Sequence, residues 1–159
     1  IAIPSRKIES ERLLRKGSNG IEFFTTQVLY DSGKIKKMMK YYDEICKKNR
    51  VLPRRILLSF APVSSKKNID FLKWLGVEIP SLTEEYLINK GTDITEESLK
   101  IATDILKDIL VNNEKLGITV PIGLNVEHIM SYNFQYSINM LQELSKIYRE
   151  FCIKTSLYD

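Results

Sequence analysis

The stretch Gly20–Asp31, GIEFFTTQVLYD, decides the fold of this chain. Its aromatic and β-branched residues lie between a glycine and an aspartate, a pattern that predicts a β-strand. Because strand side chains alternate, Phe23, Thr25 and Gln27 share one face, and Gln27 stands at the carboxyl end. Parallel α/β folds bind ligands at that edge. We therefore expect Gln27 to present its amide to a ligand; the alternative is an amide that only bonds a neighbouring loop.

The rest of the chain alternates short β-rich runs with longer helical ones. This rhythm is typical of βα units and predicts a parallel sheet in one domain, residues 1–159. The helix that follows Asp31 has an apolar stripe at helical spacing, which should pack on the sheet. The four predicted strands are residues 1–3, 21–30, 54–63 and 119–126.

The last predicted strand, TVPIGLNV, continues into Glu127. Alternation places the apolar set Val120, Ile122, Leu124 and Val126 under the helices. Asn125 and Glu127 then lie on the other face at the carboxyl end. Glu127 is the one obvious carboxylate there, so it is our candidate for proton handling or substrate binding. The alternative for both residues is hydrogen bonding to the backbone.

Composition and charge narrow the class of protein. The 159 residues are 43% hydrophobic and carry 24 basic and 20 acidic side chains, a net charge of +4. The basic residues are spread along helices instead of clustering with aromatic residues, which argues against a nucleic-acid groove. No apolar run reaches the roughly 20 residues of a membrane helix, and no signal-peptide pattern is present. We expect a cytoplasmic protein without a metal site, since the two cysteines lack metal-ligand spacing.

Four motifs together resemble the methylenetetrahydrofolate reductase family, of which this chain would be a divergent member. They are GIEFFTTQVLYD, ILLSFAPVSSKKN, LGVEIP and IGLNVEH, in the family's order. The resemblance implies a (β/α)8 TIM-type barrel, with this chain supplying roughly strands five to eight. A full barrel typically has about 250 residues. The amino-terminal half would then come from elsewhere in the same protein or from a partner chain that completes the barrel.

The resemblance also implies a reaction. Such reductases convert the methylene group of a reduced folate to methyl, with hydride from NAD(P)H passing through FAD. Gln27 matches the glutamine that bonds the pterin, and its amide offers both a donor and an acceptor. Asn68 matches a second glutamine near the folate, although it could simply cap a helix. Phe71 lies one place from the aromatic residue near the folate, and Asn125 would support the pterin.

The cofactor residues match less well. Lys16 and Glu9 stand where the family contacts the flavin phosphate and ribityl regions, yet solvated charges are normal on a helix. The flavin-wrapping loop is reduced to IPSRKIES, and the acid that assists proton transfer would lie outside this chain. Three alternatives therefore stay open: direct hydride transfer from the nicotinamide to the pterin, a non-catalytic pterin-binding or barrel-completing subunit, and an unrelated barrel enzyme.

Overall fold

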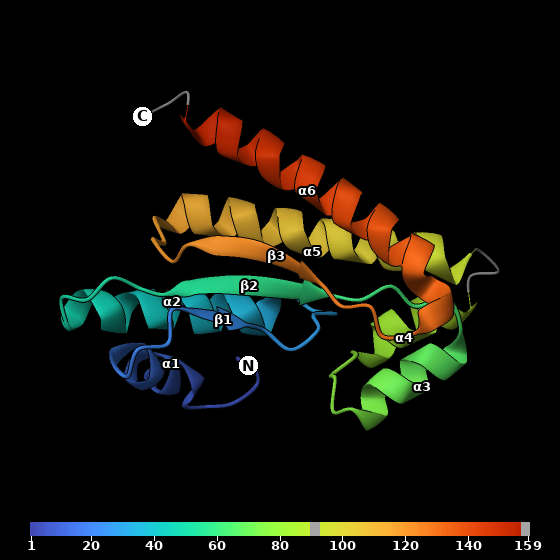
Figure 1. Ribbon diagram of the computed structural model, residues 1–159, viewed down its shortest axis with the longest axis horizontal. Helices are drawn as coiled ribbons and strands as arrows, with labels where there is room; N and C mark the ends of the chain where they lie inside the picture. Colours follow the sequence, from blue (N-terminus) through green and yellow to red (C-terminus); the bar gives the residue numbers. More distant parts are fainter. Residues whose placement is uncertain (90–92, 157–159) are drawn as a thin grey trace.

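A three-stranded parallel sheet forms the centre of the computed structural model, which describes residues 1–89 and 93–156. The strands are β1 (Phe23–Thr25), β2 (Arg55–Phe60) and β3 (Ile122–Val126), in the order β1-β2-β3 (Figure 1). Thr25 pairs with Leu57, and Leu57 pairs with Gly123. Ala2 adds one isolated parallel bridge to Thr26. The predicted parallel pairing is confirmed.

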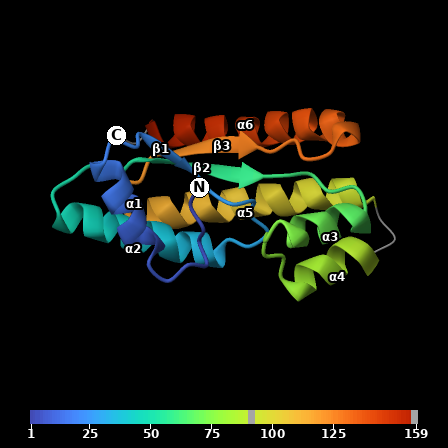
Figure 2. The same cartoon turned by 60° about the horizontal axis from the view of Figure 1, so that its bottom comes forward.

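The described residues also contain six α-helices. In both views α2 and α5 run along the sheet, α6 follows β3, and α3 and α4 lie beyond the carboxyl ends of the strands (Figures 1 and 2). None of these helices is both long and apolar enough to cross a membrane. Their bounds are α1 Glu9–Ser18, α2 Gly33–Lys48, α3 Lys66–Trp74, α4 Ser81–Asn89, α5 Ile94–Leu116 and α6 Phe134–Ser156, with a 3-10 turn, η1, at Ser131–Asn133.

The main core lies on one face of the sheet. Ile56, Leu58 and Phe60 of β2 are fully buried there against apolar side chains of α2, α5 and α6. The predicted stripe of α2 is buried as expected, since helical spacing gathers its apolar residues on the sheet side. The opposite face is more open: the Phe23 side chain is 54% exposed.

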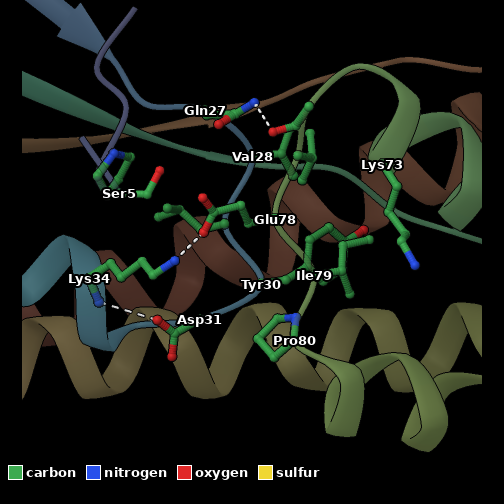
Figure 3. A pocket seen from close by; sticks show the side chains of 14 residues that line it. Ser5, Gln27, Val28, Tyr30, Asp31, Lys34, Lys73, Glu78, Ile79 and Pro80 are labelled. Carbon is green, nitrogen blue, oxygen red and sulfur yellow. Dashed lines mark hydrogen bonds and ion pairs between the residues drawn. The ribbon is translucent and has the colours of Figure 1, made fainter.

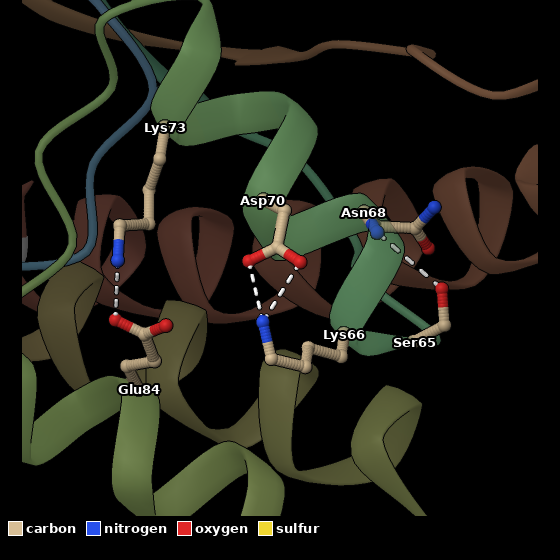
Figure 4. Close-up of polar contacts among 6 residues, drawn as sticks. All are labelled: Ser65, Lys66, Asn68, Asp70, Lys73 and Glu84. Carbon is tan, nitrogen blue, oxygen red and sulfur yellow. Dashed lines mark hydrogen bonds and ion pairs between the residues drawn. The ribbon is translucent and has the colours of Figure 1, made fainter.

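A second apolar cluster lies beyond the ends of the strands. It joins the segment after β1 to α3, α4 and the loop between them. Tyr30 contributes its ring and donates its hydroxyl hydrogen bond to the Ala61 carbonyl at 3.0 Å. On the surface, Lys73 of α3 pairs with Glu84 of α4 at 2.7 Å (Figure 4). Exposed pairs of this kind contribute about 1 kcal/mol at most, so the apolar contacts hold this unit together.

The predicted (β/α)8 barrel, with this chain as strands five to eight, is wrong. The chain forms a compact α/β domain with a small open sheet. Three helices stand between β2 and β3, and two of them pack at the end of the sheet instead of on its face. The first predicted strand contributes a single bridge, and β1 keeps only three residues. The described residues therefore form no half-barrel for a partner chain to complete.

The two faces of β2 predict different costs of truncation. Leu58→Ala removes a fully buried side chain from the main core and should lower the free energy of unfolding by about 2–5 kcal/mol. Leu57→Ala, one residue away on the half-buried opposite face, should cost at least about 1 kcal/mol less. Urea unfolding of both variants measures the difference. Equal losses would contradict the assignment of the core to one face.

Candidate functional site

The carboxyl end of β1 contains one residue more than the strand beside it. The Thr26 amide donates to the Leu57 carbonyl and the Leu29 amide donates to the Ser59 carbonyl, both at 2.9 Å. From Thr26 to Leu29 the chain advances three residues, whereas β2 advances only two between the acceptors Leu57 and Ser59. The Ser59 amide donates to the Thr26 hydroxyl oxygen at 2.9 Å. Thr26 and Ser59 are both fully buried, and a buried amide needs an acceptor. The Thr26 hydroxyl thus accepts the last hydrogen bond between the two strands, and the extra residue redirects the chain as a β-bulge does.

The redirected segment lines a cavity of about 620 Å³. Val28, Tyr30 and Ile79 give it apolar walls, and polar groups are grouped around them (Figure 3). Its walls come from the loop before α1, the segment between β1 and α2, the start of α2, and the end of α3 with the loop that follows. The lining residues are Pro4, Ser5, Gln27, Val28, Leu29, Tyr30, Asp31, Lys34, Lys73, Gly76, Val77, Glu78, Ile79 and Pro80.

Gln27 lies in this cavity and also bonds a neighbouring loop. Its side-chain nitrogen donates to the Gly76 carbonyl at 2.7 Å (Figure 3). Gly76 has a φ of 84°, a left-handed conformation that favours glycine at this turn. The amide oxygen of Gln27 makes no hydrogen bond within residues 1–89 and 93–156. The bond to Gly76 is the loop contact expected as the alternative, and a ligand role for Gln27 stays a prediction.

An ion pair crosses the same cavity. The Lys34 ammonium contacts the Glu78 carboxylate, and the Lys34 amide donates to the Asp31 carboxylate at 3.2 Å (Figure 3). The hydrogen bond from Lys34, with a further one from Ser5, lowers the pKa of Glu78 below its ordinary 4.5. A lowered pKa means that this contact is present at neutral pH and is lost as the pH falls through the lowered value. Both side chains are about half exposed, so the pair adds little stability.

Asn68 lies outside this cavity, in a buried amide network. It is 2% exposed, and its side-chain oxygen accepts from the Ser64 amide at 3.0 Å and from the Asn133 side chain at 3.2 Å. Its side-chain nitrogen donates to the Tyr132 hydroxyl at 2.6 Å. The Ser65 hydroxyl accepts from the Asn68 amide, capping α3 (Figure 4). The network ties α3 to η1, and a ligand role for Asn68 stays a prediction.

Asn125 and Glu127 lie together on the open face of β3, as the alternation predicts, but they do not line the cavity. The Asn125 side chain donates to the Ser59 hydroxyl at 3.0 Å and approaches the Glu127 carboxylate at 3.5 Å. Phe71 stacks on Trp74 with ring centroids 5.7 Å apart, also outside the cavity lining. The structure thus separates the predicted substrate residues, and roles for these three stay predictions.

The residues that the resemblance assigns to a flavin do not fit one at this cavity. Glu9 is buried, accepts from the Ile3 amide at 3.2 Å and pairs with Arg6 at 3.1 Å. Its carboxylate anchors the loop before α1 onto the helix. Lys16 lies on α1 outside the cavity lining. No flavin contact follows from either position.

Sequence reasoning gave no site role to five polar residues of the cavity: Ser5, Asp31, Lys34, Lys73 and Glu78. Each is an ordinary charged or polar residue in its local sequence. Lys34 and Glu78 are 44 residues apart, so no short pattern pairs them. The motif LGVEIP contains Glu78 and was the available signal, although it gave the residue no role.

The fold and the site define an α/β protein with a ligand-sized cavity at the carboxyl edge of a parallel sheet. No protein-family model and no curated protein sequence matches the chain. Among solved structures, it is similar to an uncharacterized protein from Clostridium thermocellum that binds two copies of 5-methyl-5,6,7,8-tetrahydrofolic acid. The TM-score is 0.78 and the identity 26%, over 92% of this chain. This chain spans about half of that protein, 52% of its length.

An isosteric substitution tests the role of the Thr26 hydroxyl as acceptor for the Ser59 amide. Thr26→Val keeps the shape but removes the acceptor for the buried Ser59 amide, so the free energy of unfolding should fall by about 1–3 kcal/mol. Thr25→Val, on the partly exposed face, should change it by less than about 0.5 kcal/mol. Urea unfolding compares the two variants. Equal losses in the free energy of unfolding would mean that the Thr26 hydroxyl does not stabilise the bulge.

Proposed function

We propose that this chain binds a reduced folate in the cavity at the carboxyl end of β1, with Gln27 orienting the pterin ring. One observation carries the proposal: Gln27, which the sequence resemblance assigns to the pterin, lies in this cavity. The likeness to a protein that binds a methylated tetrahydrofolate supports the same ligand class.

The chemistry of the lining suits a pterin. One edge of the ring carries both hydrogen-bond donors and acceptors, and the free amide oxygen of Gln27 would accept from a ring donor. The Asp31 and Glu78 carboxylates are further acceptors for the ring's amino group. Val28 and Ile79 supply apolar contact for the ring faces. Apolar walls with a few placed polar groups are typical of small-molecule sites.

The proposal concerns binding, because the cavity geometry supports binding alone. Reduction of a methylene group with hydride from NAD(P)H stays a prediction of the sequence resemblance. The positions of Glu9 and Lys16 argue against a flavin beside this cavity. A non-catalytic pterin-binding protein, the alternative from the sequence, accounts for the same observations.

Substitution of Gln27 tests the ligand's location. Gln27→Ala should weaken 5-methyltetrahydrofolate binding by about threefold to tenfold, the value of one hydrogen bond, measured by isothermal titration calorimetry. Gln135→Ala is the matched control, since Gln135 is an exposed glutamine on α6 outside the cavity. Undiminished binding by Gln27→Ala would overturn the proposal. If Asn125→Ala weakened binding in its place, the ligand would lie on the open sheet face.

Two measurements on the natural protein test the redox prediction. Because the residues assigned to the flavin do not fit one, we expect an absorbance spectrum without flavin bands. A long-wavelength band that bleaches with 5-methyltetrahydrofolate would contradict this and support the reductase. NAD(P)H oxidation that depends on methylenetetrahydrofolate would establish the reductase without a flavin. Folate binding without such oxidation would leave a binding protein.

A further inference from the structure

The connection between α2 and β2 is rich in basic residues. Its sequence is KKNRVLPRR, residues 47–55, and the chain has no acidic residue between Glu44 and Asp70. We call residues 47–55 the basic loop. Because parallel strands begin at the same edge of a sheet, the basic loop lies at the amino end of β2, whereas the cavity lies at the carboxyl end of β1 (Figure 1). A partner at this loop would therefore not occupy the cavity.

Hydrogen bonds fix the backbone of the basic loop at both ends. The Val51 amide donates to the Cys46 carbonyl at 3.1 Å, which ends α2 in a Schellman motif. The Arg54 amide donates to the hydroxyl of the buried Tyr42 at 3.0 Å. The loop thus presents its side chains from a fixed backbone.

Arg50 occupies the position of the Schellman motif where glycine is usual. Its φ is 56°, and it is the only residue other than glycine with a positive φ in residues 1–89 and 93–156. A side chain is crowded in this left-handed conformation, which glycine adopts at lower cost. The Arg50 side chain is exposed and makes no ion pair or hydrogen bond within the same residues. Its charge is therefore available to an external partner.

Exposed aliphatic side chains lie between the arginines of the loop. Leu52 is 89% exposed and Val51 is 43% exposed. One exposed leucine is ordinary on a protein surface, but these two adjoin Arg50 and Arg54. An apolar tip flanked by basic residues is typical of segments that bind the surface of an anionic bilayer.

The ends of two other helices lie beside the basic loop and add to its charge. A Cβ atom added to Gly17 of α1 would lie 3.1 Å from the Arg54 side chain. The Lys47 ammonium donates to the Gly117 carbonyl at the end of α5, at 3.2 Å. Both helices carry basic residues in their last turns: Arg15 and Lys16 in α1, and Lys115 in α5.

The acids at this end of the molecule are fewer than the cations. Asp43 is buried and pairs with Lys47 at 2.5 Å. Glu22 and Glu114 are exposed. Five cations have no carboxylate partner in the part of the chain that the structure describes: Lys16, Lys48, Arg50, Arg54 and Lys115. The surface around the basic loop is therefore positively charged.

We propose that the basic loop docks this protein on the surface of an anionic lipid bilayer. Leu52 would enter the headgroup region, and the surrounding cations would contact lipid phosphates and carboxylates. A nucleic acid would match the charge, but the loop has no aromatic side chain to stack on a base, and its most exposed side chain is aliphatic. This inference does not depend on the proposed folate site.

Sedimentation with lipid vesicles tests the docking in the intact protein. At low salt the protein should sediment with phosphatidylcholine vesicles that contain about one third phosphatidylserine, and not with pure phosphatidylcholine vesicles. High salt should release it, because salt screens exposed charges. Absence of binding to the anionic vesicles, or equal binding to both kinds, would overturn the proposal.

Two substitutions separate docking from folding. Arg50→Gly removes one charge and should weaken vesicle binding about fivefold. The same change should raise the midpoint of urea unfolding, since glycine adopts the left-handed conformation without strain. Leu52→Ser removes the apolar tip and should weaken vesicle binding about threefold to tenfold.

Matched controls are Lys37→Gln and Leu82→Ser. Lys37 is an exposed lysine near the start of α2, and Leu82 is an 80% exposed leucine of α4. Both variants should bind vesicles as the unaltered protein does. Equal losses in the loop variants and the controls would overturn the proposal, since net charge or general hydrophobicity would then explain the binding. Binding to a single-stranded oligonucleotide without binding to vesicles would overturn it as well.

Discussion

The hydrogen bond from the buried Ser59 amide to the Thr26 hydroxyl is the contact on which the functional edge depends. In a regular ladder the acceptor would be the Thr26 carbonyl. Since the side chain takes this role, the backbone after Thr26 can turn away from β2 without leaving the buried Ser59 amide unpaired, while the Gln27 amide donates to the Ala2 carbonyl at 2.9 Å. An unpaired amide would cost about 1–3 kcal/mol. The extra residue then directs the chain toward α3 and forms one wall of the cavity.

The opposite wall is held by contacts of a different kind. Gly76 turns the chain after α3 in a left-handed conformation, and the Gln27 side chain stabilises that turn by donating a hydrogen bond to the Gly76 carbonyl. The Lys34–Glu78 pair fastens the next residues to the start of α2. These polar contacts are weak compared with the apolar clusters beneath them. The cavity therefore has a rigid apolar base and a polar rim.

The polar residues at the ends of the strands do not converge on one point. Gln27 lines the cavity. The Asn68 side chain makes its hydrogen bonds within the network that joins α3 to η1, and the Asn125–Glu127 pair lies on the open face of β3. Of the three places, the cavity has ligand size.

Local patterns by themselves determined where β2 and β3 lie and which face of α2 is buried, but they overestimated the strands expected at residues 1–3 and 21–30. The α2 stripe and the position of Gln27 at a strand end follow from geometry that repeats every few residues. Only the tertiary structure decided that the sheet stays open and which residues complete the cavity. Gln27 contacts Gly76, which is 49 residues away in the sequence, and Lys34 contacts Glu78, which is 44 residues away. Such contacts, like the bulge at Thr26, depend on how distant segments pack, which no periodicity within one segment encodes.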